Sequence, residues 1–304
     1  MRNFNQTLRT TLILSLSIVL FLTNGCKKTE EKLTATEFPE PGFQLPQGDH
    51  DYDQRIMDYY KRWDSYVLYK FSQQDINWRV VEYDTYYKSV PALPDYINAQ
   101  LDLLESTFFK YYSDATLKQF LPRKVFLCSS LGTGTTTITQ VESYLLPFVN
   151  GRFGGYQSFA LNGGNAGVTS INKAVYRGNV NFSFLKMMDL EGKMKRSDAF
   201  TGISDYTNAI VGTTQADRYK RGFLVLPANL PIVSLDWQAF IQVIVSNSYA
   251  YLTDPATTAS DTTPKGILSP VKDTNGLIKR KYDAMISFYK QQYGIDLQTI
   301  GDGK

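Results

Sequence analysis

Histidine is the most versatile side chain for metal binding and acid–base chemistry, and His50 is the only histidine in the 304 residues. One imidazole cannot build a two-histidine zinc site, and a Ser-His-Asp triad would have to use this residue. His50 stands in the polar run Gln47 to Asp51, which is typical of a surface loop. The histidine count therefore excludes much of metallopeptidase and triad chemistry.

Carboxylates offer two further possibilities. Asp49, Asp51 and Asp53 alternate around His50 and could attract calcium, but the segment lacks the glycine and the distal glutamate of an EF-hand loop. Asp189 and Glu191 could serve a glycosidase only if they faced each other across a sugar bond. Two residues apart on a helix, they point to different faces. Neither group predicts a catalytic site, and the calcium alternative stays open.

A glycine-containing segment, Gly132-Thr133-Gly134, follows a predicted strand and raises the alternative of a phosphate-binding loop. It lacks the Gly-Lys-Ser/Thr ending that brings a lysine and a magnesium-binding hydroxyl to the phosphates. A threonine-rich surface loop is the favoured interpretation. Cys128, in an apolar stretch, is expected to be a buried small hydrophobe without a disulfide partner.

Aromatic residues are abundant, with 21 Tyr, 18 Phe and 3 Trp. Three adjacent pairs, Tyr59-Tyr60, Tyr86-Tyr87 and Tyr111-Tyr112, cannot place both rings in the core of a helix or strand. Exposed rings could stack on sugars or peptide side chains. Amphipathic tyrosines at the domain surface explain the same pairs without a ligand, and this is the favoured interpretation.

The N-terminus has the order of a bacterial lipoprotein signal. Arg2 and Arg9 precede an apolar run from Leu12 to Leu22, which is short for a membrane span but typical of a signal peptide. Gly25-Cys26 then resembles the end of a lipobox. We expect residues 1–25 to be removed and Cys26 to carry the lipid that anchors the protein.

The residues after Cys26 predict a tether and a cellular location. Residues 26–48 contain three prolines and two glycines, which disfavour regular structure. The charged run Lys27 to Lys32 is similar to the tags of Bacteroidetes surface lipoproteins, which implies an outer-membrane location facing the cell exterior. Without residues 1–25 the chain has 30 basic and 29 acidic residues, and no clustered basic stripe, so no nucleic-acid partner is expected.

The periodicity of apolar residues predicts one α+β domain over residues 49–304, with helices and a small mixed sheet. A polar loop is expected over Asp254–Gly276. The other expected elements are helices over Asp51–Trp63 and Asp95–Tyr111, an extended segment over Tyr66–Phe71, strands over Lys124–Ser129, Tyr156–Leu161 and Val168–Ile171, and helices over Phe182–Leu190, Ser234–Ala250 and Leu277–Tyr293.

Several segments together resemble the zinc-metallopeptidase lipoproteins encoded beside SusC/SusD-type uptake systems in Bacteroidetes. The resemblance covers most of residues 50–297 and implies a zincin-like fold. The segments that resemble the family are the lipobox, Tyr59 to Asp64, Leu101 to Leu104, Phe120 to Leu127, Arg221-Gly222-Phe223, Leu235-Asp236-Trp237 and the ending Tyr289 to Leu297.

The resemblance fails where those enzymes hold zinc through His-Glu-x-x-His on a helix. The corresponding stretch, Asn181 to Gly192, contains no histidine, and the acid of a second stretch corresponds to Ala239. The residues expected at the lost metal site are Phe184, Leu185, Met187, Met188, Glu191 and Ala239. We expect no catalytic residue, metal or cofactor, and we expect the apolar side chains to fill the former site beside the Trp237 and Tyr282 helices.

These observations favour a non-catalytic surface lipoprotein that assists a SusC/SusD-like TonB-dependent nutrient uptake complex. It would bind a peptide, a glycan or the transporter itself, and the Cys26 lipid would be its only membrane contact. One alternative is an independent glycan-binding surface lipoprotein with a flat Trp or Tyr platform. Another is a hydrolase that uses carboxylates alone and has two acids facing each other in a deep cleft.

Overall fold

The structure, a computed structural model, describes residues 43–72, 75, 87–133, 136–138, 144–145, 148–149, 152–153, 158–212, 214–224, 230–255 and 258–304. Residues Phe43–Lys304 form one compact unit. This unit starts earlier than the predicted boundary at residue 48, because Phe43 packs edge-on against Phe126 and Gln47 bonds the backbone of Tyr69. Cys26 and the predicted signal peptide lie outside the described residues.

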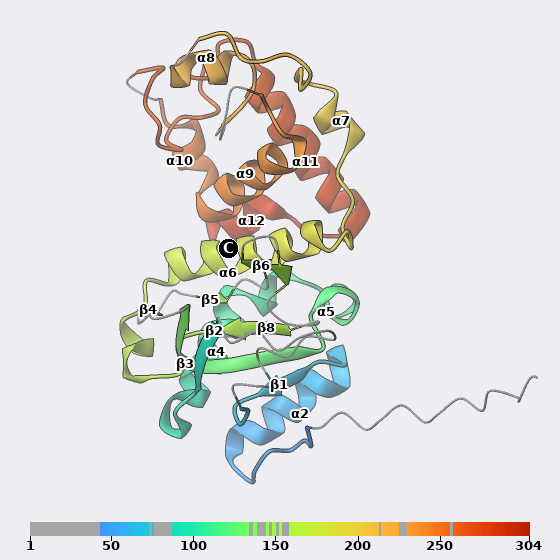
Figure 1. The fold of residues 1–304 in the computed structure, drawn as a ribbon, viewed down its shortest axis with the longest axis vertical. Helices are drawn as coiled ribbons and strands as arrows, with labels where there is room; N and C mark the ends of the chain where they lie inside the picture. The colour runs from blue at the N-terminus through green and yellow to red at the C-terminus, as the bar shows by residue number, and fades with distance from the viewer. Residues whose placement is uncertain are drawn as a thin grey trace, which may run out of the picture. The chain divides into compact units, whose positions relative to one another are not determined.

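The predicted mixed sheet is confirmed and is organised around one long strand, β3 (Lys124–Thr133) (Figure 1). The first half of β3 pairs in parallel with β1 (Tyr66–Leu68) and β8 (Ser158–Leu161). Its second half pairs antiparallel with β2 (Tyr87–Pro91) and β4 (Thr136–Ile138). The remaining strands are β5 (Tyr144–Leu145), which pairs with β8, and the separate pair β6 (Phe148–Val149) and β7 (Arg152–Phe153).

The loop predicted after the central strand is wrong at Gly132 and Thr133. Both residues continue β3, where they pair with β2 on one side and with β4 on the other. Backbone groups committed to two ladders are not free to surround a phosphate. Gly134 lies outside the described residues.

The N-terminal helices follow the predicted periodicity closely. α2 covers Asp51–Trp63, as predicted, and buries Tyr52, Ile56 and Tyr59. The helix predicted over Asp95–Tyr111 is divided into a 3-10 turn η1 (Pro94–Tyr96), α4 (Ile97–Thr107) and a second 3-10 turn η2 (Phe109–Tyr111). A further helix, α5 (Asp114–Phe120), begins at the N-cap Ser113, whose hydroxyl accepts from the Thr116 N–H.

The strand predicted over Val168–Ile171 is wrong. The segment forms the 3-10 helix η3 (Ala166–Ser170), because the Asn165 side chain accepts from the Gly167 N–H and caps a turn. The helix α6 (Lys173–Leu190) follows and begins nine residues before the predicted start at Phe182. The segment Val168–Ile171 is too short for its apolar pattern to distinguish a strand from a turn.

The C-terminal half is helical. α11 (Leu277–Tyr293) has its predicted bounds and ends at Gly294, whose φ of 65° suits glycine. The helix predicted from Ser234 starts one residue earlier and is broken before Ala250, so α9 (Val233–Ser246) and α10 (Tyr249–Thr253) are separate. The C-terminal helices that were not predicted are α7 (Asp198–Thr201), α8 (Gln215–Lys220) and α12 (Leu297–Asp302).

The core joins these parts through α6, which lies between the sheet and the C-terminal helices (Figure 1). Phe184 of α6 contacts Phe108 and Tyr112, which precede the central strand, with ring centroids 5.2 and 5.1 Å apart. α6 also packs along α9. The domain is therefore α+β, with a main hydrophobic cluster that contains α6 and two smaller clusters.

Candidate functional site

The segment expected to replace the zinc helix is the C-terminal half of α6. Phe184, Leu185 and Met188 have no exposed surface, and Met187 is 2% exposed. Their apolar side chains occupy the core between the sheet and α9, as the flexible thioethers of methionine allow. Ala239, at the second expected position, is partly buried against the same cluster.

The two acids of this segment have separate partners. Asp189 has a side chain 1% exposed, and Arg196 binds it through two hydrogen bonds of 2.7 and 3.0 Å. Gln238 of α9 donates a third bond of 2.8 Å. Glu191 instead pairs with Lys193 at 2.7 Å. Asp189 therefore ties α6 to α9 and does not face Glu191 across a cleft.

A second buried cluster was missed by sequence reasoning. Lys281 of α11 donates to Asp236 Oδ2 at 2.7 Å and to the Gly222 carbonyl at 3.0 Å, and both charged side chains have no exposed surface. Tyr206 donates to the same oxygen at 2.6 Å. Burial raises the pKa of Asp236 and lowers the pKa of Lys281, while their contact opposes both shifts. Gly222 and Asp236 belong to the segments that carry the family resemblance.

Four aromatic rings surround this ammonium group. Its Nζ lies 4.2 Å from the centroid of Phe223, and the rings of Phe200, Tyr206 and Phe240 lie within 5.0 to 5.7 Å. Such contacts favour a desolvated cation. The cluster is sealed from solvent, so we assign it to stability and not to ligand binding.

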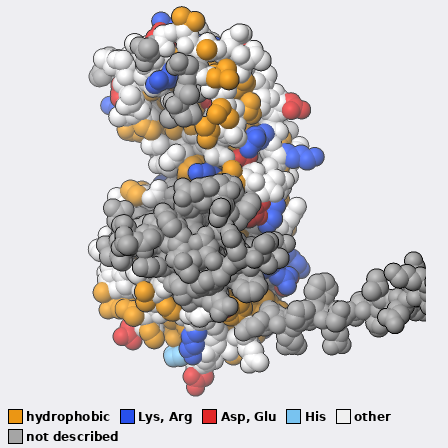
Figure 2. Space-filling view, viewed as in Figure 1, with side chains coloured by type: hydrophobic (Ala, Val, Ile, Leu, Met, Phe, Trp, Pro, Cys, Tyr) orange, Lys and Arg blue, Asp and Glu red, His pale blue; other side chains and the backbone are white. Residues whose placement is uncertain are grey.

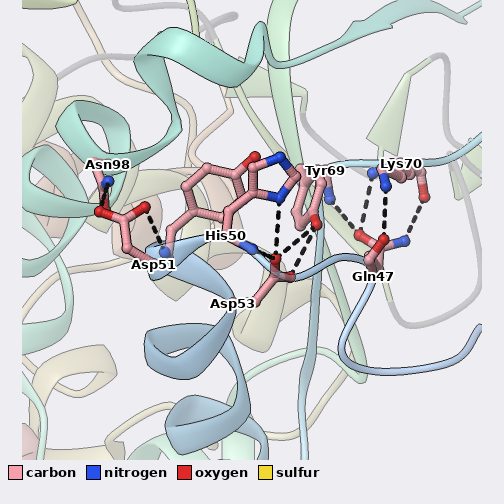
Figure 3. Close-up of polar contacts among 8 residues, drawn as sticks. Gln47, His50, Asp51, Asp53, Tyr69, Lys70 and Asn98 are labelled. Atoms are coloured by element: carbon pink, nitrogen blue, oxygen red, sulfur yellow. Dashed lines mark hydrogen bonds and ion pairs between the residues drawn. The ribbon is translucent and has the colours of Figure 1, made fainter.

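The predicted surface histidine opens α2 and belongs to a polar network (Figure 3). Asp53 accepts from the backbone N–H of His50 at 2.9 Å and lies 3.2 Å from its Nδ1. The hydroxyl of Tyr69, at the end of β1, donates to Asp53 at 2.8 Å. A carboxylate near the first turn also complements the helix dipole. The network fixes the imidazole beside the strand end.

Gln47 holds the other side of this strand end (Figure 3). Its Oε1 accepts from the N–H groups of Tyr69 and Lys70, and its Nε2 donates to the Lys70 carbonyl at 2.7 Å. Lys70 Nζ returns a bond of 2.6 Å to the Gln47 carbonyl. Gly48 fits here because a Cβ would lie 2.8 Å from both His50 Nδ1 and the Tyr69 hydroxyl.

A pocket of ≈ 360 Å³ opens beside this network. The lining residues are His50, Tyr52, Tyr69, Lys70, Phe71, Pro91, Ala92 and Pro94. They come from the start of α2, the end of β1 and the β2–η1 turn. Figure 2 shows the histidine at the surface with hydrophobic side chains gathered beside it. Because four of the lining residues are aromatic, the pocket is a candidate binding site.

Tyr52 is one of the buried residues that line the pocket. Its ring stacks on His50 at 4.7 Å and meets Tyr69 edge-on at 5.1 Å. Burial raises its pKa, and its hydroxyl has no hydrogen-bond partner among the described residues. A buried unpaired hydroxyl costs roughly 1–3 kcal/mol. Sequence reasoning could not find this pocket, because its walls are assembled from three separate segments.

The described residues contain no group of three or more His, Cys, Asp or Glu side chains placed to hold a metal ion. Two of the three aspartates considered for calcium are engaged in other bonds. Asp51 accepts from the Tyr52 N–H and from Asn98, and Asp53 accepts from Tyr69. Cys128 is buried, and burial raises the pKa of its thiol.

Comparison with known proteins is sparse. The sequence matches no protein-family profile and no curated protein. The structure is similar to the crystal structure of a candidate zinc-binding metallo-peptidase from Bacteroides caccae, with a TM-score of 0.44 and 14% sequence identity over 82% of this chain and 91% of that one. Among the described helices, none combines the length and hydropathy needed to span a bilayer.

Proposed function

We propose that this chain is a non-catalytic, lipid-anchored surface protein that binds a nutrient for a SusC/SusD-like uptake complex. The observation that carries the proposal is the state of α6. Phe184, Leu185 and Met188 are fully buried where the resembling enzymes hold zinc between histidines. Burying each such side chain contributes roughly 1.5–3 kcal/mol, so this segment stabilises the core in place of binding metal.

The acids of the segment support the same proposal. A hydrolase using carboxylates alone needs one acid to protonate the leaving group and another to activate or attack. Asp189 instead forms an ion pair with Arg196 and accepts a hydrogen bond from Gln238, and Glu191 forms an ion pair with Lys193.

The surface assignment rests on the order of charged, apolar and small residues before Cys26, and on the charged run that follows. A lipid on Cys26 would tether the domain, which begins at Phe43, near the outer leaflet. A lipid tether of this kind suits a protein that passes ligand to a neighbouring transporter.

Metal analysis and peptidase assays on purified protein test the absence of catalysis. We expect no stoichiometric zinc and no peptide cleavage, with wild type and Glu191→Gln behaving alike. About one zinc per chain, or cleavage that Glu191→Gln abolishes, would overturn the proposal.

Protease shaving of intact cells tests the location. We expect wild type to be cleaved from the outside and Cys26→Ala to leave the membrane fraction. Crosslinking on intact cells should then recover SusC/SusD-like components with wild type and not with Cys26→Ala. Full protection of wild type from the protease, or equal recovery of these components with Cys26→Ala, would contradict the proposal.

A further inference from the structure

The carboxylates of three exposed residues lie around the pocket beside His50. Asp49 and Asp51 flank the histidine in the sequence, and Asp95 follows Pro94, which lines the pocket. The carboxylates of Asp49 and Asp95 make no hydrogen bond or ion pair within the described part of the chain. Uncompensated charges of one sign around a pocket attract a ligand of the opposite sign.

The negative charge acts on the wall of the pocket. The pKa of Tyr52, a buried residue of that wall, is raised first by burial and then by nearby carboxylates. These carboxylates are Asp53, Asp51 and Asp95, in order of effect. The hydrogen-bond donors to Asp51, which are the Tyr52 N–H and the Asn98 amide, are neutral and do not cancel its charge. An anionic ligand would therefore be repelled at the same wall.

Two cationic side chains could compensate these carboxylates, and both have other partners. Lys70 lines the pocket, but its ammonium donates to the Gln47 carbonyl at 2.6 Å (Figure 3). The same ammonium lies over the Tyr69 ring, 5.5 Å from its centroid. Arg55 of α2 is paired with two carboxylates of α4. The carboxylates around the pocket therefore outnumber the cations, and the imbalance favours a cationic ligand.

The walls of the pocket present aromatic rings to such a ligand. Tyr69 already has the Lys70 ammonium over its ring, so a ring of this pocket contacts a cation in the free protein. Phe71 is half-buried against Phe126, with ring centroids 4.8 Å apart, and no cation of the described residues lies over it. Aromatic faces attract organic cations, and nearby carboxylates add to that attraction. An inorganic divalent cation needs several oxygen ligands instead, and the described residues hold no group of three placed to bind one.

We infer that this pocket binds one organic cation, an alkylammonium or guanidinium group. The Phe71 ring contacts the cation and its alkyl chain, and the carboxylates of Asp49, Asp51 and Asp95 attract the charge. A basic side chain of a peptide and a free amine both carry this group, and the experiment below distinguishes them. The inference rests on the proposed function and deepens it, because it places the nutrient site and makes the nutrient a cation.

Because the chain has one histidine, the imidazole signals of His50 in a proton–carbon NMR spectrum report on the pocket without assignment. Full-length protein in a non-ionic detergent would be titrated, at fixed pH and ionic strength, with the acetyl methylamides of lysine and arginine and with butylammonium. Comparison probes are the acetyl methylamides of norleucine and glutamate, glucose and calcium chloride. We expect saturable shifts with the cationic organic probes at millimolar concentration, and none with the comparison probes.

The double variant Asp49→Asn/Asp95→Asn removes two exposed charges that make no ion pair in the described part of the chain, so it should fold normally. We expect it to weaken binding of the lysine probe about fivefold at low salt, as two surface charges would. Asp254→Asn/Asp283→Asn is the control of equal net charge, because these exposed acids pair with lysines of the C-terminal half. It should bind like wild type. At about 1 M salt, where the Debye length is about 3 Å, wild type and Asp49→Asn/Asp95→Asn should become similar.

Tighter binding of the lysine or arginine probe than of butylammonium would support a peptide as the source of the cation, and equal affinities would support a free amine. Saturation by the norleucine, glutamate or glucose probe, or by calcium alone, would overturn the inference. No shift with any organic cation, or equal affinity of wild type and Asp49→Asn/Asp95→Asn at low salt, would also overturn it. None of these outcomes depends on zinc content or surface location, so failure here is distinguishable from failure of the proposed function.

Discussion

Two aspartate–tyrosine pairs in this protein differ chiefly in how exposed the basic partner of the aspartate is. Asp53 accepts from Tyr69 at 2.8 Å, and Asp236 accepts from Tyr206 at 2.6 Å. The basic partner of Asp53 is His50, whose side chain is 44% exposed, at the edge of a pocket. The partner of Asp236 is Lys281, which has no exposed surface.

The comparison separates two uses of the same side chains. Around Asp236 every group except the second carboxylate oxygen is bonded or caged, and the cluster joins α9, α11 and the Gly222 turn. Around His50 the network reaches the surface, where the exposed imidazole lines the pocket. We therefore expect changes at the sealed pair to affect stability most, and changes at the open pair to affect binding.

The largest effect is expected from Lys281→Met. The substitution leaves the Asp236 carboxylate buried without its cation, which costs about 3–5 kcal/mol of unfolding free energy. Urea denaturation followed by circular dichroism would measure it. The double variant Lys281→Met/Asp236→Leu should recover much of the loss, because no charge is then buried alone. If Lys281→Met lowers the unfolding free energy by no more than the loss of a surface ion pair would, the cluster is not sealed from solvent.

Substitutions of Tyr206 and Tyr69 are expected to have effects of intermediate size on the unfolding free energy. Tyr206→Phe removes a donor from a carboxylate with few alternatives and should cost roughly 1–3 kcal/mol. Tyr69→Phe should cost less, about 0.5–1.5 kcal/mol, because Asp53 keeps the His50 N–H. The same denaturation assay compares them. Equal losses of unfolding free energy, or a larger loss for Tyr69→Phe, would contradict the distinction between the sealed Asp236 cluster and the open His50 network.

His50→Ala should change stability by less than about 1 kcal/mol, as for other half-exposed ion pairs. The capping bond survives the substitution because it uses the His50 backbone N–H. Thermal unfolding would detect the shift. A loss comparable to that of Lys281→Met would mean that the imidazole is part of the core, and the pocket would then not be an open site.

The sequence was a good guide where one element buries one face. The apolar spacing of Asp51–Trp63 and Leu277–Tyr293 predicts the bounds of α2 and α11 as they are observed. The absence of histidine from the α6 segment is equally legible. Local pattern failed at Val168–Ile171, where the Asn165 side chain decides for a 3-10 turn, and at Gly132, where two partner strands extend β3.

The sealed and open sites were beyond local pattern. Asp236 and Lys281 are 45 residues apart in the chain, and the residues next to them in the sequence do not indicate that they pair. The pocket draws on segments near residues 50, 70 and 92. Such sites follow from packing between elements, which a single sequence does not reveal.

The smallest effect concerns Asp261, which lies between the two extremes. Its side chain is 27% exposed, while its partner Lys272 is buried and also donates to the Thr263 carbonyl at 2.6 Å. Bonds from the Thr263 N–H and hydroxyl, and then from Lys272, lower the pKa of Asp261 from 3.8 to about 2. Because the unfolded chain binds the proton more tightly, this carboxylate stabilises the fold in full above pH 3.8, and the contribution is lost as the pH falls through about 2.

Asp261→Asn should therefore remove a small part of the acid sensitivity and leave a flatter stability curve between those two pH values. Urea denaturation at several pH values, with Asp254→Asn as the control for an exposed partner of Lys265, would isolate it. Parallel curves for wild type and Asp261→Asn would show that Lys272 and Thr263 do not hold the carboxylate in solution. Half-open pairs would then behave like surface pairs, and only full burial would separate the Asp236 cluster from the His50 pocket.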